Sequence, residues 1–120
     1  MSADHLFVYG TLRRGSNNQF ARLLAERAHF VGPARVSGRL YDFGSYPGAR
    51  REEGSIIGEI VRLDPLGELL GVLDDYEGPE YERAATTAHT AEGHTIDAWI
   101  YWYAKATQGK IIASGDWFVR

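Results

Sequence analysis

The stretch that decides the fold is TIDAWIYWY, residues Thr95–Tyr103. Successive side chains of a strand point to opposite faces, and here both sets of positions are rich in apolar and aromatic residues. One face would carry Ile96, Ala98, Ile100 and Trp102, and the other would carry Trp99, Tyr101 and Tyr103. A strand that is buried on both faces is typical of a small barrel with helices or loops packed outside it. We therefore expect this segment to lie at the centre of the fold.

The neighbouring segments predict further strands, mostly antiparallel. Residues 81–89 and 95–103 would form a hairpin around a turn at Glu92-Gly93. A glycine inside a strand often marks a bend or a close approach of another backbone, as at a barrel corner. The remaining strands, two of which contain such a glycine, are expected at residues 5–9, 34–43 (with Gly38) and 55–63 (with Gly58).

Two short helices are predicted outside the strands. The first spans Gln19 to Ala28 and places Phe20, Leu23, Leu24 and Arg27 at helical spacing. The second would begin at Asp64-Pro65, since aspartate caps a helix and proline fits its first position. Its buried face would consist of Leu66, Leu69, Leu70 and Leu73, and Gly78-Pro79 would end it. The fold class is therefore mixed α/β (α+β): residues 1–120 as a single domain, a small, mostly antiparallel β-barrel with a few short flanking helices.

Bulk composition excludes several classes of protein. The 120 residues are 44% apolar and 24% charged, as in an ordinary globular domain, and they include no Cys. Disulfides, thiolate metal sites and a cysteine nucleophile are therefore excluded. The net charge of −3 argues against nucleic acid as a partner. We expect no membrane segment, because no apolar run approaches the length that is needed, and we expect a cytoplasmic protein. Nothing in the sequence indicates the oligomeric state.

Two short motifs carry the chemistry. Tyr9-Gly10-Thr11-Leu12 follows the first strand, and a turn of this kind can direct successive N–H groups toward a carboxylate or phosphate. Glu77 follows the apolar helix within an acidic run and precedes Gly78. Neighbouring carboxylates and partial burial would both raise its pKa, as a general acid/base near neutral pH requires. The alternative for the first motif is an ordinary turn after a strand with no binding role, and the alternative for Glu77 is a solvated acidic turn.

The same residues resemble the gamma-glutamylcyclotransferase-like family, in its AIG2-like branch, which includes gamma-glutamylamine cyclotransferases. The resemblance extends over nearly the whole chain in the expected order. It rests on Tyr9–Leu12, Gly38–Asp42 with Tyr46–Gly48, Leu73–Gly78, Tyr81–Arg83 and Ser114–Trp117. It implies a compact barrel with a site in a cavity at one end, in which Tyr9, Gly10, Thr11 and Leu12 bind the substrate and Glu77 is the acid/base.

The resemblance also implies a reaction. The α-amine of a gamma-glutamyl substrate would attack its own side-chain carbonyl, releasing 5-oxoproline and an amine or amino acid. Such a ring closure needs no cofactor, metal or protein nucleophile. The alternative is a non-catalytic module that binds a small acidic metabolite in the same pocket, because a shared fold does not guarantee shared chemistry.

Other candidate sites are weaker. His89 and His94 flank a predicted turn, so we expect no metal site there. The run from Gly10 to Ser16 lacks the lysine of a phosphate-binding loop. Paired arginines such as Arg13-Arg14 are expected at the solvated surface. Arg83 leaves the sign of the Glu77 pKa shift open, since pairing with that carboxylate would lower the pKa.

Overall fold

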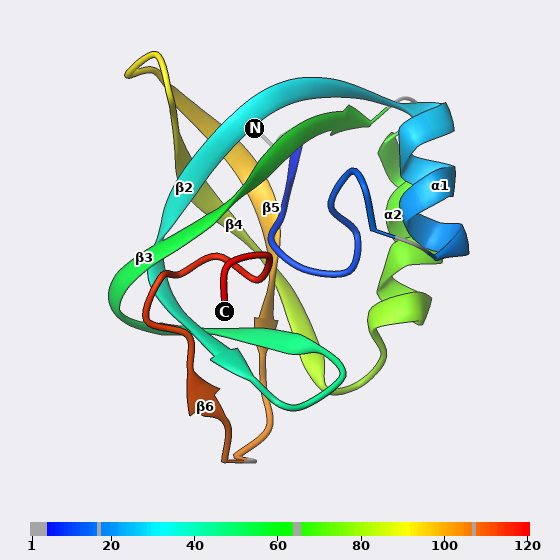
Figure 1. Cartoon of the computed structure of the whole chain (residues 1–120). Coiled ribbons are helices and arrows are strands. Elements are labelled where there is room, and N and C mark those ends of the chain that lie inside the picture. Colours follow the sequence, from blue (N-terminus) through cyan, green and yellow to red (C-terminus); the bar gives the residue numbers. More distant parts are fainter. Residues whose placement is uncertain (1–4, 17, 64–65, 107) are drawn as a thin grey trace.

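The computed structural model describes residues 5–16, 18–63, 66–106 and 108–120, and of residues 66–68 it describes the backbone alone. Six strands and two helices follow one another along these described residues (Figure 1). In order they are β1 (His5–Val8), α1 (Gln19–Arg27), β2 (Ala28–Asp42), β3 (Pro47–Leu63), α2 (Leu66–Glu77), β4 (Tyr81–Thr90), β5 (Thr95–Tyr103) and β6 (Lys110–Ile111).

The strands close into a barrel, as the sequence predicts. Antiparallel hairpins join β2 to β3 and β4 to β5. The two hairpins meet on both sides, through an antiparallel pairing of β2 with β4 and a short parallel one of β3 with β5. β1 pairs antiparallel with β3 and touches β5 at a single parallel position. The predicted class, a mostly antiparallel barrel with short flanking helices, is confirmed.

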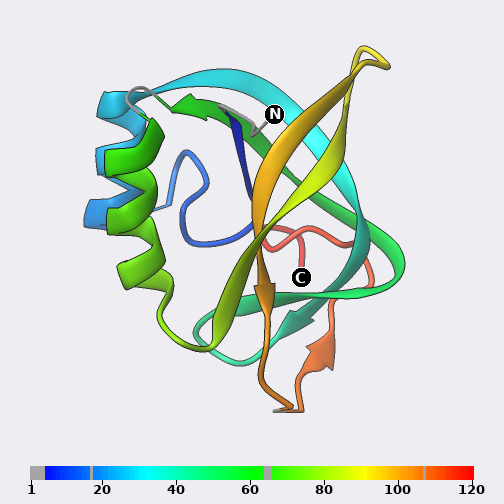
Figure 2. The ribbon, with the colours of Figure 1, turned by 180° about the vertical axis from the view of Figure 1, so that it is seen from behind.

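The two helices lie side by side against one side of the barrel (Figures 1 and 2). In both views, the loop that follows β1 runs between the barrel and the helices. This arrangement divides the apolar side chains into two clusters. One fills the barrel and includes Phe7, Ile56 and Ile100. The other lies between the barrel and the helices and includes Leu24 and Leu73.

β5 contributes to both clusters, which confirms that it is buried on two faces. Ala98, Ile100 and Trp102 belong to the cluster inside the barrel, and Tyr101 belongs to the cluster under the helices. β1 behaves in the same way, since Phe7 and Tyr9 point into the barrel while Leu6 and Val8 face the helices. The strand that leads into the loop is therefore held from both sides, which gives the loop a rigid origin.

Gly58 shows why a glycine interrupts β3. A Cβ atom at this position would contact the carbonyl oxygen of Val8 and come within 2.8 Å of the Phe7 ring. The backbone of β3 therefore packs directly on β1, a close approach of the kind predicted. Gly38 marks a second irregularity, because the β2–β3 register shifts between Ser37 and Arg39.

Element boundaries differ from the prediction where pairing overrides composition. β2 and β3 are longer than expected because they form one long hairpin on both sides of a register shift. Ser37 pairs with Ser55 and Arg39 pairs with Arg50, so the exposed, charged stretch 51–53 lies within the shift. On α1, Ala21 is buried and Arg27 is exposed. On α2, Leu69, Leu70 and Leu73 are buried as predicted, whereas the Asp64-Pro65 start and the side chain of Leu66 lie outside the described residues. β6 carries no local signal and was not predicted.

Candidate active site

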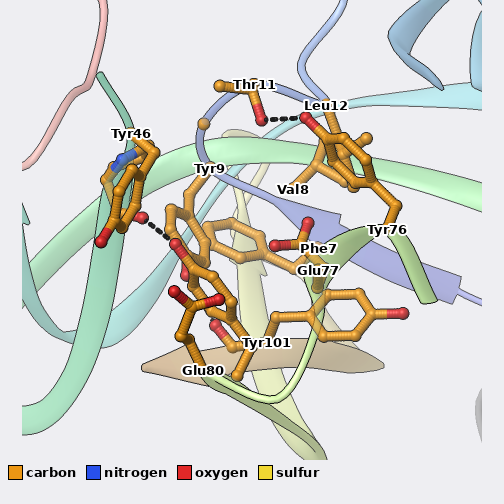
Figure 3. Close-up of a pocket in the computed structure, with 13 residues that line it drawn as sticks. Phe7, Val8, Tyr9, Thr11, Leu12, Tyr46, Tyr76, Glu77, Glu80 and Tyr101 are labelled. Atoms are coloured by element: carbon orange, nitrogen blue, oxygen red, sulfur yellow. Dashed lines mark hydrogen bonds between the residues drawn. The ribbon is translucent and has the colours of Figure 1, made fainter. Parts of the chain in front are cut away.

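A cavity of about 220 Å³ opens where the loop after β1 meets the end of α2 (Figure 3). Its walls come from four regions of the chain. The lining residues are Phe7, Val8, Tyr9, Gly10, Thr11, Leu12, Tyr46, Pro47, Tyr76, Glu77, Glu80, Tyr81 and Tyr101. All five residues that the sequence singled out, Tyr9, Gly10, Thr11, Leu12 and Glu77, therefore line the same cavity.

The loop after β1 turns its carbonyl groups toward the protein. The carbonyl of Gly10 accepts a hydrogen bond from the Arg13 amide at 3.0 Å, and that of Thr11 accepts one from Asn18 Nδ2 at 2.6 Å. Within the described part of the chain, the N–H groups of Gly10, Thr11 and Leu12 donate no hydrogen bond. Buried amides ordinarily find a partner, so these three are available to an anionic ligand.

Contacts with both helices hold this loop in position. Asn18 caps α1 by accepting hydrogen bonds from the amides of Phe20 and Ala21, while its Nδ2 group donates to Thr11. The hydroxyl groups of Thr11 and Tyr76 lie 2.9 Å apart, and Tyr76 immediately precedes Glu77 (Figure 3). One hydrogen bond therefore links the amide-bearing loop to the residue next to the carboxylate.

Tyr9 anchors the start of the loop through its side chain. Its hydroxyl donates to the Tyr101 carbonyl at 2.6 Å and accepts from the Ala49 amide at 3.3 Å. Both partners lie on barrel strands, β5 and β3. The Tyr9 ring is thus buried in the barrel and forms the floor of the cavity (Figure 3).

Glu77 is the last residue of α2 and lies within its final turn. The sequence had suggested a position just past the end of the helix. The helix ends because Gly78 adopts a φ of +79°, and its amide donates to the Asp74 carbonyl at 3.0 Å. A glycine in this left-handed conformation is the usual C-terminal stop of a helix. Figure 3 shows the Glu77 carboxylate in the cavity between Tyr76 and the Tyr9 side.

Burial raises the pKa of the Glu77 carboxyl to about 7. The groups around it are aromatic and hydroxyl-bearing, and a carboxylate is poorly solvated among them. At neutral pH the side chain therefore exists in both protonation states in comparable amounts. A group with this property can accept a proton and return it within one catalytic cycle.

Arg83 does not offset this shift, because it pairs with Asp74. Although burial acts in the opposite direction, hydrogen bonds from Arg83 and from the Tyr101 hydroxyl lower the pKa of the Asp74 carboxyl. Asp74 stays ionised, and the guanidinium group next to the site is neutralised by it. The direction of the Glu77 pKa shift, which the sequence left open, is therefore upward.

Arg13 is a second charged residue whose place the sequence did not reveal. It was expected at the surface with Arg14, yet Arg13 is 9% exposed and Arg14 is exposed. Its Nε donates to Glu59 at 3.3 Å and its Nη1 donates to Asp116 at 2.7 Å. The prediction for Arg13 is wrong because two carboxylates from distant segments neutralise it inside the protein.

Beyond the predicted residues, the lining includes side chains that sequence reasoning did not name as site candidates: Phe7, Val8, Tyr46, Pro47, Tyr76 and Glu80. Tyr81 and Tyr101, strand aromatics for which ordinary packing is the default expectation, also line the cavity, whereas Tyr103 does not. No sequence signal points to these side chains, since aromatic residues on strands are usually core and acidic residues after a helix are usually solvated. Their position depends on how the β2–β3 turn folds over the end of α2.

Two further kinds of site were searched for in the described residues. No group of three or more His, Cys, Asp or Glu side chains is arranged there to bind a metal ion. Within the same ranges, no helix combines the length and apolar composition that a membrane crossing requires.

Comparisons with known proteins point to one family. The family model described as gamma-glutamyl cyclotransferase, AIG2-like, matches residues 6–119. The chain is 34% identical over 117 residues to the gamma-glutamylcyclotransferase family protein YtfP of Escherichia coli K12, covering 96% of each chain.

Solved structures agree with this match. The solution structure of the Escherichia coli protein ytfP superposes with a TM-score of 0.69 at 35% identity, covering 94% of this chain and 95% of that one. The crystal structure of an AIG2-like protein from Mus musculus superposes with a TM-score of 0.74 at 29% identity, covering 89% and 81%.

Proposed function

The chain belongs to the gamma-glutamyl cyclotransferase, AIG2-like family, and from this premise we propose that it is an enzyme that releases 5-oxoproline from a gamma-glutamyl compound, with Glu77 as its acid/base. The observation that carries the proposal is the cavity, in which a carboxyl group with a pKa raised to about 7 by burial lies opposite a loop whose Gly10, Thr11 and Leu12 amides donate no hydrogen bond among the described residues.

Substrate binding would use the two ends of this arrangement. The amides of Gly10, Thr11 and Leu12 would hold the α-carboxylate of the glutamyl group, since successive N–H groups form a concavity suited to an anion. Glu77 would then lie near the α-ammonium group. The cavity volume of about 220 Å³ is of the order of a glutamyl group with the first atoms of its leaving group.

The reaction would proceed by proton transfers through Glu77 around one ring closure. The Glu77 carboxylate accepts a proton from the α-ammonium group, and the freed amine nitrogen attacks the gamma-carbonyl carbon. A new C–N bond closes the five-membered lactam, Glu77 gives its proton to the leaving nitrogen, and the bond to that nitrogen breaks. The ring nitrogen then passes its second proton through Glu77 to the released amine, which departs as an ammonium ion, so the enzyme ends as it began.

Holding one molecule in a folded conformation accounts for the small number of catalytic groups. Attack within a bound substrate avoids the entropy cost of a bimolecular encounter, and good orientation can lower the barrier by about 7 kcal/mol or more. The protein then has to supply a proton acceptor of suitable pKa and a rigid cradle. The contacts of Tyr9, Thr11 and Asn18 would provide that rigidity.

The test is to incubate the protein with gamma-glutamyl amines and dipeptides and to measure 5-oxoproline. Glu77→Gln should lower kcat by about 100-fold or more, the usual range for removing an acid/base, while substrate binding measured by calorimetry remains. Asp75→Asn is the matched control, since Asp75 is exposed on the same helical turn.

Two results would contradict the proposal. Turnover by Glu77→Gln at the normal rate would remove Glu77 from the mechanism. Tight binding by the unmodified protein without any lactam would favour a binding module over an enzyme.

A further inference from the structure

The cavity has a charge pattern that the ring closure itself does not require. Among the described residues that line it are two carboxylates, Glu77 and Glu80, and no Lys, Arg or His. Glu77 is assigned to the reacting amine. Glu80 is therefore a second negative charge in the cavity wall, and the binding of the glutamyl group does not require it.

Glu80 faces the cavity. Among the described residues, its carboxylate makes no hydrogen bond or ion pair, and its backbone carbonyl accepts the Ala104 amide at 2.7 Å. Burial, and after it the charge of Glu77, raises the pKa of Tyr81, and the charge of Glu80 adds in the same direction. The two carboxylates thus act on the same phenol from within one cavity.

The position of Glu80 relative to the amide loop indicates which part of a substrate it would meet. In Figure 3, Glu80 and Tyr46 lie on one side of the cavity, Leu12 and Tyr76 lie on the other, and Glu77 lies between them. A glutamyl group that is anchored on the amides of Thr11 and Leu12 and reacts beside Glu77 would extend its leaving group toward Glu80 and Tyr46.

We propose that Glu80 is a specificity residue that favours gamma-glutamyl compounds whose leaving amine carries a further positive charge and disfavours those with a carboxylate at that end. This inference rests on the proposed function for the direction of the leaving group. A cation would be attracted by Glu80 and by the faces of nearby tyrosine rings, whereas a carboxylate would meet a like charge with no cation in the wall to balance it.

The experiment compares three gamma-glutamyl amides of closely similar length, made from putrescine, pentylamine and γ-aminobutyrate. Their leaving groups are cationic, neutral and anionic. We expect kcat/KM to fall in that order, with the cationic compound about tenfold above the neutral one, as for charges a few ångströms apart near solvent. This preference should weaken as salt is raised, because Glu80 is partly exposed.

Variants at Glu80 assign the preference to this residue. Glu80→Gln should reduce the ratio of the cationic to the neutral compound toward one, and Glu80→Lys should favour the anionic compound. Glu82→Gln is the control and should leave the ratio unchanged. The Glu82 side chain is 68% exposed, lies 3.8 Å from Arg51 and does not line the cavity.

The outcomes separate this inference from the proposed function. If lactam forms from all three compounds at equal kcat/KM, or if Glu80→Gln changes all three equally, the role of Glu80 is wrong and the proposed function stands. If no lactam forms, the proposed function fails. In that case the inference is tested by calorimetry, which measures the binding of the same three compounds to the Glu77→Gln protein. Equal affinities for the three compounds, or no binding of any of them, would overturn the role of Glu80.

Discussion

Arg83 donates two hydrogen bonds to Asp74, one from Nε to Oδ1 at 2.8 Å and one from Nη2 to Oδ2 at 3.1 Å. Asp74 lies one turn before Glu77 on α2, and its Oδ1 also accepts the Tyr101 hydroxyl at 2.7 Å. This arrangement places a permanent negative charge and a neutralised guanidinium group behind the cavity. The ionisation of Glu77 is therefore governed by its burial.

Activity should depend on pH through Glu77. Because its pKa is raised to about 7 and the carboxylate is the form that accepts the first proton, log kcat/KM should rise with pH below about 7 and level off above it. Initial rates of 5-oxoproline release across about pH 5 to 9 check this. A profile that levels off near pH 4.5 would show that the carboxyl is not buried in the working enzyme.

Asp74→Asn should shift that profile to lower pH. The substitution leaves the Arg83 charge without the carboxylate that neutralises it, and an uncompensated positive charge beside the site favours the ionised form of Glu77. We expect the acidic limb of kcat/KM to move down by about half to one pH unit. Asp75→Asn changes the same charge on the exposed side of the turn and should move the limb less. Equal shifts in the two variants would assign the effect to net charge alone.

Glu77→Gln should stabilise the protein at high pH. The folded pKa of Glu77 lies above its ordinary value of 4.5, so the folded state binds the proton more tightly than the unfolded state. The stability that this group contributes is present below about pH 4.5 and is lost as pH rises through about 7. Urea unfolding should therefore find the variant about 1 to 3 kcal/mol more stable than the original at pH 8 and little different at pH 4.5. A constant difference at both pH values would contradict the linkage.

Arg13→Met should destabilise the fold by about 3 kcal/mol. Arg13 and Glu59 are each 9% exposed, and removal of the guanidinium group leaves a buried carboxylate with the Arg14 amide at 2.9 Å as its remaining partner. Arg14→Met is the control, because that side chain is exposed and covers the Phe30 ring, a contact worth less than about 1 kcal/mol at the surface. Chemical denaturation gives both values, and equal losses would mean that the buried network does not stabilise the fold.

Two glycine substitutions should have opposite effects. Gly58→Ala forces a Cβ onto the Val8 carbonyl and the Phe7 ring, so we expect a loss of about 3 kcal/mol or failure to fold. Gly71 lies in α2 with nothing within 4 Å of an added Cβ, and Gly71→Ala should stabilise by about 0.5 to 1 kcal/mol. Thermal melts of the two variants compare them directly. A neutral Gly58→Ala would mean that β1 and β3 can separate without cost.

Much of the fold follows from local pattern. The two apolar faces of Thr95–Tyr103, the leucine spacing of α2 and the stop at Gly78 are each readable within a dozen residues, because side-chain period and backbone preference are local properties. The site motifs were readable for the same reason. The amide-rich turn at Gly10 and the carboxylate at Glu77 each have a short signature, and the structure places both on one cavity.

The sequence by itself therefore determined the strand and helix types and the two motifs that carry the proposed chemistry. Only the tertiary structure decided that Arg83 pairs with Asp74, that Arg13 is buried between Glu59 and Asp116, and that Glu80 faces the cavity. The physical reason is that the ionisation of a carboxyl depends on the surfaces and charges within a few ångströms of it. Those neighbours come from segments tens of residues away, as with Arg13 and Asp116, which are 103 positions apart.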